Sequence, residues 1–230
     1  MKPWRVRQWC IPPEATAAFV WKMEDVLDVY TQSYDEERVL VCLDETTKQQ
    51  VMEVRQPVEA APGREYRYDA EYKRNGVSNV FMLFAPLESW RHVEVTDQRT
   101  KLDWARVVRQ LVDEHFPEVK KIVLVMDNLN THSPASLYEA FSPEEAKRIA
   151  DKLEIHYTPK HGSWLNMAEI ELSILARQCL SRRIPDQQTL RHEAAAWEKT
   201  RNEGGATIDW RFTTQDARIK LKRLYPSFVV

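Results

Sequence analysis

Two continuous apolar runs, each ending in an aspartate, constrain the fold of this 230-residue chain more than any other feature. The first spans residues 38–44 (RVLVCLD) and the second spans residues 121–127 (KIVLVMD). Continuous apolarity with β-branched residues is typical of a strand buried on both faces by helices. An unpaired carboxylate beside a core costs several kcal/mol, so two such strand ends indicate a functional site. The alternative is that both aspartates only cap loops.

The remaining segments predict an α/β plan. Short apolar runs at residues 80–87, 90–95 and 154–157 indicate further strands, and residues 63–76, rich in charge and tyrosine, indicate a loop or ragged hairpin. Apolar residues at helical spacing, with proline and capping signals, predict helices over residues 14–30, 101–116, 134–141, 143–153, 163–180, 185–201 and 216–224. Ser163 is the expected N-cap of the helix that follows it. Three strands, a helix and then alternating strands and helices favour a mixed sheet.

Composition excludes several classes of protein. The chain is 43% hydrophobic, with 5 Gly and 12 Pro, so it is neither fibrous nor wholly disordered. It contains no apolar run near the ~18 residues that span a bilayer, and no signal core follows its first residues. Three distant cysteines make no disulfide framework. We therefore expect a reduced, cytoplasmic, globular protein without a membrane partner.

Charge is unevenly distributed along the chain. The net charge is −2, but residues 177–230 hold 11 Lys and Arg against 6 Asp and Glu. This imbalance is compatible with a polyanionic partner, although solvated helix faces would produce it as well. The candidate phosphate-binding residues are Lys160, His161, Arg182, Arg183, Lys220, Lys222 and Arg223.

The two strand-end aspartates predict a metal site. If the strands are parallel neighbours, Asp44 and Asp127 converge, and like charges at that distance repel unless a cation lies between them. Oxygen ligands favour Mg²⁺ or Mn²⁺. Glu169 is the best third carboxylate, with Asn166 on the same helix face, whereas Glu171 lies roughly 200° further round and should face elsewhere. Two cations about 3.5–4 Å apart suit in-line displacement at phosphorus.

Three blocks together resemble the catalytic motifs of DDE transposases: residues 43–45 (LDE), 126–132 (MDNLNTH) and 159–169 (PKHGSWLNMAE). The sequence is most similar to the mariner-like superfamily, in its bacterial insertion-sequence branch (the IS-six-thirty group). The resemblance implies a ribonuclease-H-like, retroviral-integrase-like fold with Asp44, Asp127 and Glu169 as the catalytic, metal-binding residues. It further implies cleavage of transposon ends, joining of the 3′ hydroxyl to target DNA, a preference for TA targets, and a dimer or larger assembly on DNA. The expected location is the bacterial cytoplasm, at the nucleoid.

The resemblance also shapes the expected domain organisation. Such enzymes usually begin with DNA-reading helix-turn-helix domains, whereas Trp4, Trp9 and the Pro12-Pro13 pair resemble the linker that follows them. We expect a linker and helix over residues 1–35, a catalytic domain over 36–203 and a basic C-terminal helix or tail over 204–230. This organisation predicts a catalytic-domain fragment or a gene truncated at its front.

Some residues and functions stay open. His132 and Asn128 either support the metal pocket or simply build a turn, and Glu45, which should point to the opposite face from Asp44, is a weak candidate for a fourth ligand. The chain could instead be a ribonuclease-H-like or resolvase-like nuclease that only hydrolyses, or a non-catalytic DNA-binding remnant of a transposase. A nucleotide cofactor is not expected, because the five glycines form neither G-x-G-x-x-G nor a P-loop.

Overall fold

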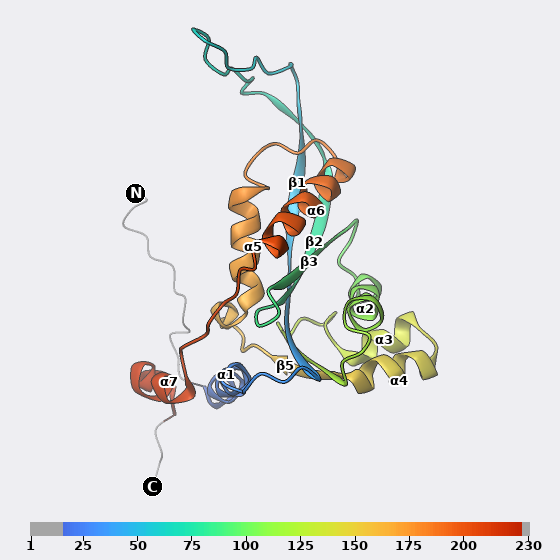
Figure 1. Ribbon diagram of the computed structural model, residues 1–230, viewed down its shortest axis with the longest axis vertical. Coiled ribbons are helices and arrows are strands. Elements are labelled where there is room, and N and C mark those ends of the chain that lie inside the picture. Colours follow the sequence, from blue (N-terminus) through green and yellow to red (C-terminus); the bar gives the residue numbers. More distant parts are fainter. Residues whose placement is uncertain (1–15, 227–230) are drawn as a thin grey trace.

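A five-stranded mixed sheet forms the centre of the protein (Figure 1). A computed structural model describes residues 16–226, so the predicted linker features from Trp4 to Pro13 lie outside the described residues. The strand order is β3-β2-β1-β4-β5. β1 pairs antiparallel with β2 and parallel with β4, as the mixed-sheet prediction requires. The strands are β1 (Arg38–Glu53), β2 (Tyr72–Ala85), β3 (Trp90–Thr96), β4 (Lys121–Met126) and β5 (Leu153–Tyr157).

Helices cover both faces of this sheet, and alternation along the strands explains the two cores. Cys42 and Val125 point into one core, and Leu43 and Leu124 into the other. The first core lies under α1 (Ala17–Tyr30), α5 (Met167–Gln178), α6 (Gln187–Glu203) and α7 (Thr214–Lys220). The second lies under α2 (Lys101–Gln110), α3 (Pro134–Ala140) and α4 (Pro143–Lys152). Short helical turns complete the chain: η2 (Leu111–His115), η3 (Ser163–Leu165) and η4 (Lys222–Leu224).

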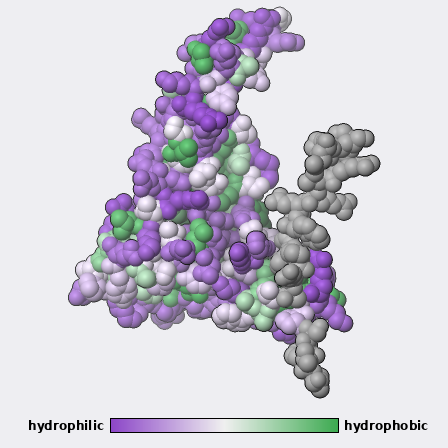
Figure 2. Space-filling view, turned by 180° about the vertical axis from the view of Figure 1, so that it is seen from behind, coloured by the Kyte–Doolittle hydropathy of each residue, from purple (hydrophilic) through white to green (hydrophobic). Residues whose placement is uncertain are grey.

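The β1–β2 hairpin is much longer than the apolar runs predicted. β1 continues nine residues past Asp44, and residues 54–71 form the end of an arm that projects beyond the helices (Figure 1). Figure 2 shows that this arm is largely hydrophilic. Because both faces of the arm meet solvent, its sequence carries no apolar alternation that would reveal a strand. Of the two predictions for residues 63–76, a loop or a ragged hairpin, the hairpin is confirmed, with Tyr72 to Gly76 in the regular strand β2.

Side chains from α6 protect the exposed edge of β3. Asn202 binds both backbone groups of Arg91, accepting from its N–H at 3.0 Å and donating to its carbonyl at 2.9 Å. Glu198 accepts from the Val93 N–H at 2.8 Å. Unpaired edge groups invite pairing with another chain, so α6 closes the sheet on this side.

The same edge supports a prediction on pH-dependent stability. Burial would lower the pKa of His92, but Glu198, with a carboxylate oxygen 3.2 Å from Nδ1, and Glu94 raise it to about 9. A histidine pKa raised on folding stabilises the fold below about 6.5, and this stabilisation is lost as pH rises towards 9. We expect His92→Gln to cost about 1–2 kcal/mol of unfolding free energy at pH 6 and far less at pH 10. Urea denaturation at both values checks this, with the exposed His192→Gln as control; equal losses at both values would contradict it.

Candidate active site

The β1–β4 ladder brings Asp44 and Asp127 to the same level of the sheet. The last parallel pair is Cys42 with Val125, and each aspartate lies two residues further along the chain. Because side chains alternate along a strand, both aspartates belong to the face on which Cys42 and Val125 meet α5. The expectation that the two strands are parallel neighbours is confirmed.

Asn166 ties helix α5, which carries Glu169, to β1. Its side-chain N–H group donates to the Leu43 carbonyl at 2.8 Å, and its side-chain oxygen accepts from the Ala168 N–H at 3.1 Å. Asn166 is 2% exposed, so both bonds are shielded from water. One buried amide thus caps α5 and anchors it beside Asp44, and Glu169 lies in the first turn of that helix.

The prediction that Ser163 caps this helix is wrong. Ser163 begins the short turn η3, and α5 starts at Met167 with Asn166 as its N-cap. A tight turn precedes η3: the Gly162 N–H donates to the Pro159 carbonyl at 2.8 Å, and His161 has a φ of +64°. A Cβ at Gly162 would lie 2.5 Å from the Pro159 ring, so no larger residue fits there. The chain needs this turn to reverse direction before α5.

The three predicted carboxylates interact electrostatically. Burial is the main cause that raises the pKa of Asp44 to about 7; the Glu45 N–H at 2.8 Å opposes the shift, while the charges of Glu169, Glu45 and Asp127 add to it. Burial and the charge of Asp127 also raise the pKa of Glu169, against a hydrogen bond from Ser163. Mutual repulsion among acids that remain close together is the situation a bound cation relieves.

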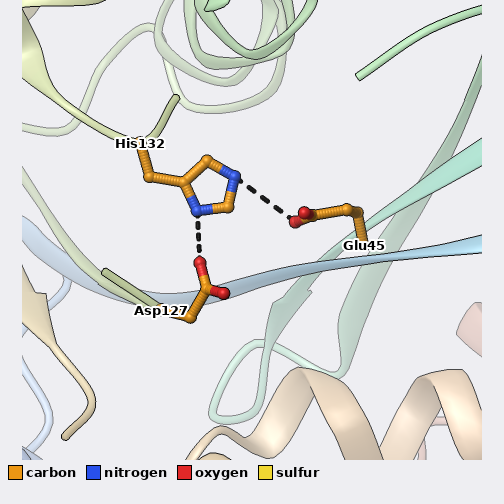
Figure 3. Close-up of side chains that lie close together, drawn as sticks. All are labelled: Glu45, Asp127 and His132. Carbon is orange, nitrogen blue, oxygen red and sulfur yellow. Dashed lines mark hydrogen bonds and ion pairs between the residues drawn. The ribbon is translucent and has the colours of Figure 1, made fainter. Parts of the chain in front are cut away.

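His132 lies between two acids on the other side of Asp127 (Figure 3). Its Nδ1 is 2.5 Å from Asp127 Oδ1 and its Nε2 is 3.3 Å from Glu45 Oε2. The imidazole also stacks on buried Trp104, with ring centroids 6.1 Å apart. Glu45 therefore points away from Asp44, as the alternation predicted. Although burial opposes it, contact with both acids raises the pKa of His132 to about 9, so the ring is protonated at neutral pH.

One group of side chains at this site could hold a divalent cation. Within residues 16–226, Glu45, Asp127 and His132 form one group whose ligand atoms all lie within 4.8 Å of one another. Both ring nitrogens of His132 face carboxylate oxygens of these two acids, so the imidazole connects Asp127 to Glu45. The second carboxylate oxygen of Asp127 points away from the imidazole (Figure 3).

Comparison with known families decides the assignment. The family of DDE superfamily endonucleases matches residues 39–191, which include all three carboxylates. The chain belongs to the DDE superfamily endonucleases. A search of curated proteins found no match. The enzyme class predicted from the three blocks is therefore confirmed at the level of this superfamily.

Solved structures place this endonuclease chain in a known fold. The Mos1 mariner paired-end complexes with Mn and with Mg match with TM-scores of 0.59 and 0.60, at 14% and 13% identity, over 96% and 97% of this chain. The Mos1 strand transfer complex matches with a TM-score of 0.58, at 14% identity, over 87% of this chain. The chain spans 65%, 67% and 61% of those three proteins, respectively. The predicted ribonuclease-H-like fold is confirmed.

The basic candidates of this DDE endonuclease occupy three regions. Lys160 and His161 are exposed in the turn that precedes η3 and α5. Arg182 and Arg183 follow the far end of α5, and each forms an ion pair. Arg182 pairs with Glu193, and Arg183 pairs with Glu53 at 2.5 Å. The last group lies in α7 and η4, with α7 beside α1 (Figure 1), and it comprises Lys220, Lys222 and Arg223.

Other structural features have little trace in the sequence. Tyr30, at the end of α1, donates to the Leu165 carbonyl at 2.7 Å and so supports the start of the catalytic helix from 135 residues away. The Glu45–His132 contact likewise joins two segments that no local pattern connects. Asn128 is exposed beside Leu129 in a shallow hollow that also borders Glu45. Among residues 16–226, no helix is long and apolar enough to cross a membrane.

Proposed function

We propose that this chain is the catalytic domain of a DNA transposase of the mariner-like superfamily, in its bacterial insertion-sequence branch. It would cleave DNA at transposon ends and join the freed 3′ hydroxyl to target DNA. The observation that carries the proposal is that Asp44 and Asp127 follow adjacent parallel strands in a DDE superfamily endonuclease. The bond from Asn166 to Leu43, which ties the start of α5 and its Glu169 to β1, supports it. The likeness to mariner complexes supports it.

Each residue has a defined task in this proposal. Asp44, Asp127 and Glu169 would hold Mg²⁺ or Mn²⁺, two ions per site, which would activate the attacking oxygen and stabilise the leaving one. His132 fixes the rotation of the Asp127 carboxylate and neutralises part of its charge with Glu45 on the far side. Asn166 fixes α5. Lys160 and His161, held in the exposed turn, would contact phosphates of the bound DNA.

The partners proposed are transposon-end DNA, target DNA and at least one further copy of the chain. We infer that residues 36–203 form the catalytic domain and that the segments 1–35 and 204–230 flank it. The contact between the flanks supports this division, because Arg218 of α7 forms an ion pair with Glu24 of α1 at 2.8 Å. Both flanking helices pack on the same face of the sheet as α5.

A product assay tests the reaction. A labelled duplex with a 3′ hydroxyl, taken from the inverted repeats that flank the coding sequence, is incubated with plasmid and Mg²⁺ or Mn²⁺. We expect label joined to the plasmid, because water and a 3′ hydroxyl can use the same site. Cut strands without joined strands would identify a nuclease. A non-catalytic remnant of a transposase would form neither product and would show no carboxylate-dependent Mn²⁺ binding in calorimetry.

A further inference from the structure

The hydroxyl of Tyr30 joins the strand that carries Asp44 to the segment that leads into α5. It donates to the Leu165 carbonyl at 2.7 Å. Because its proton is used in that bond, the Cys42 thiol is the donor in the second contact, with Sγ 3.5 Å from the Tyr30 oxygen. Cys42 lies two residues before Asp44 on β1, and Leu165 lies four residues before Glu169. Tyr30 thus links the two segments whose separation determines how far apart these carboxylates lie.

The Leu165 carbonyl lies outside the hydrogen-bond ladder of α5. Asn166 is the N-cap, so its own carbonyl accepts the first bond of the helix, and Leu165 precedes it by one residue. Leu165 is fully buried, and a buried carbonyl is destabilised when a hydrogen-bond partner is removed. The bond from Tyr30 therefore stabilises this segment in the position that the structure shows.

Asn166 provides a second attachment beside the first. Its side-chain N–H group donates to the Leu43 carbonyl at 2.8 Å. Two consecutive residues before Met167 are thus tied to two consecutive residues of β1, one through Tyr30 and one directly. A single bond would let α5 pivot about it, whereas two bonds also fix the direction of the helix.

Packing alone does not hold the Tyr30 ring. A cavity of about 220 Å³ borders this ring and also Met167, the first residue of α5. Trp210, from the segment between α6 and α7, packs on the ring with centroids 5.0 Å apart at 56°. Its Nε1 donates to the Phe212 carbonyl at 2.8 Å, which holds the indole in place. Because open space adjoins the Tyr30 ring, the hydroxyl bonds are needed to keep it in this orientation.

We propose that Tyr30 is a positioning residue, which fixes the start of α5, and hence Glu169, relative to the strand that carries Asp44. The inference rests on the function proposed above and adds to its active site a residue of α1, outside the 36–203 domain. Tyr30 acts through the Leu165 backbone and contacts neither metal nor DNA. It follows that α1 cannot be removed without loosening the carboxylate site.

Hydrogen exchange, measured by mass spectrometry on the full chain in EDTA, tests the attachment without any cleavage. We expect Tyr30→Phe to speed exchange in residues 163–170 by about 3- to 10-fold, the factor for one lost hydrogen bond, with residues 101–152 unchanged. Tyr225→Phe is the matched control, because it removes a hydroxyl bonded to Glu24 of α1 at 2.8 Å and leaves the Leu165 bond intact. Unchanged exchange in 163–170, or equal acceleration in both regions, would overturn the proposal.

Plasmid nicking kinetics measure what the attachment contributes to the reaction. We expect Tyr30→Phe to lower kcat about 3- to 10-fold and to leave the KM for DNA unchanged, because it displaces a carboxylate and removes no DNA contact. The Mg²⁺ concentration for half-maximal nicking should rise by a similar factor. Trp210→Leu, which keeps the Tyr30 hydroxyl but removes the indole that packs on its ring, should shift both quantities in the same direction. A raised KM with an unchanged kcat in Tyr30→Phe contradicts a positioning role.

The two experiments distinguish this inference from the proposed reaction. If Tyr30→Phe exchanges and nicks like the wild type while the wild type forms joined products, the positioning role fails and the transposase proposal stands. If the variant shows the expected exchange but the wild type forms neither cut nor joined products, Tyr30 still fixes the start of α5 and the catalytic proposal fails.

Discussion

Asp127→Asn is expected to reduce metal-dependent DNA nicking by at least about 10³-fold, and Asp44→Asn and Glu169→Gln should do the same. Stabilisation of a transferring phosphoryl group by bound cations is worth several kcal/mol, and each 1.36 kcal/mol corresponds to a factor of ten in rate. Each amide keeps the size of the acid but removes the charge that would hold the cation. Plasmid nicking in Mg²⁺ and in Mn²⁺ measures the loss.

Folding controls make this result specific. The Asp44 and Glu169 variants should retain the circular dichroism spectrum and should not unfold below the wild type in EDTA, because burial and repulsion already disfavour the charges of Asp44 and Glu169. Asp127→Asn also removes the ion pair with buried His132, so it is assayed at a temperature at which its spectrum shows that it is folded. Glu203→Gln, an exposed glutamate at the end of α6, serves as the neutral comparison and should nick normally. Substantial nicking by any of the three variants would remove that residue from the catalytic site.

Glu171→Gln, in contrast to the carboxylate variants above, should cause a large loss of folding stability. Glu171 is 1% exposed and lies 3.0 Å from Arg201 and 3.5 Å from Arg91, which is itself fully buried. Removing one partner of a buried ion pair leaves the other charge without compensation, which costs about 3–5 kcal/mol. We expect the melting temperature to fall by roughly 10 °C, given about 2–4 °C per kcal/mol for a chain of this size.

The matched control for this variant lies on the same helix. Glu169→Gln changes the same residue type two positions earlier and should leave the melting temperature near that of the wild type. Thermal melts of both variants, together with nicking assays at a temperature where both are folded, separate the structural glutamate from the catalytic one. A loss below about 1 kcal/mol for Glu171→Gln would contradict a structural role for the buried pair.

The positions of these two glutamates could be predicted from the sequence because the helix repeat is local. At about 100° per residue, Glu171 must face away from a site that Glu169 faces, and its burial against Arg91 confirms this. The buried strands and their terminal aspartates could also be predicted from the sequence, since an apolar run that ends in a charge is a local pattern. The partners of Glu171 were not, because Arg91 lies 80 residues earlier in the chain.

The N-cap of α5 was predicted wrongly because two local capping signals were similar in strength. Ser163 and Asn166 are both good N-cap residues, and the structure chooses Asn166 because only its longer amide reaches the Leu43 carbonyl while capping Ala168.

The length of the arm was missed for a different reason, although a loop or ragged hairpin was predicted at residues 63–76. A hairpin with solvent on both faces needs no apolar alternation. Its length is set by the β1–β2 pairs, which end at Glu53 and Tyr72, and by the bridges between Val58 and Arg67 and between Ala61 and Arg64.

The sequence by itself determined the superfamily, through the order of its motifs, and it supplied the residues that we propose carry the chemistry: two strand-end aspartates and a helical glutamate. Only the tertiary structure decided how they are held. The bond from Asn166 to Leu43 and the position of His132 between Asp127 and Glu45 both depend on contacts between distant segments. Local patterns record which side of an element is buried, whereas the identity of the partner on that side is fixed only when the chain is packed.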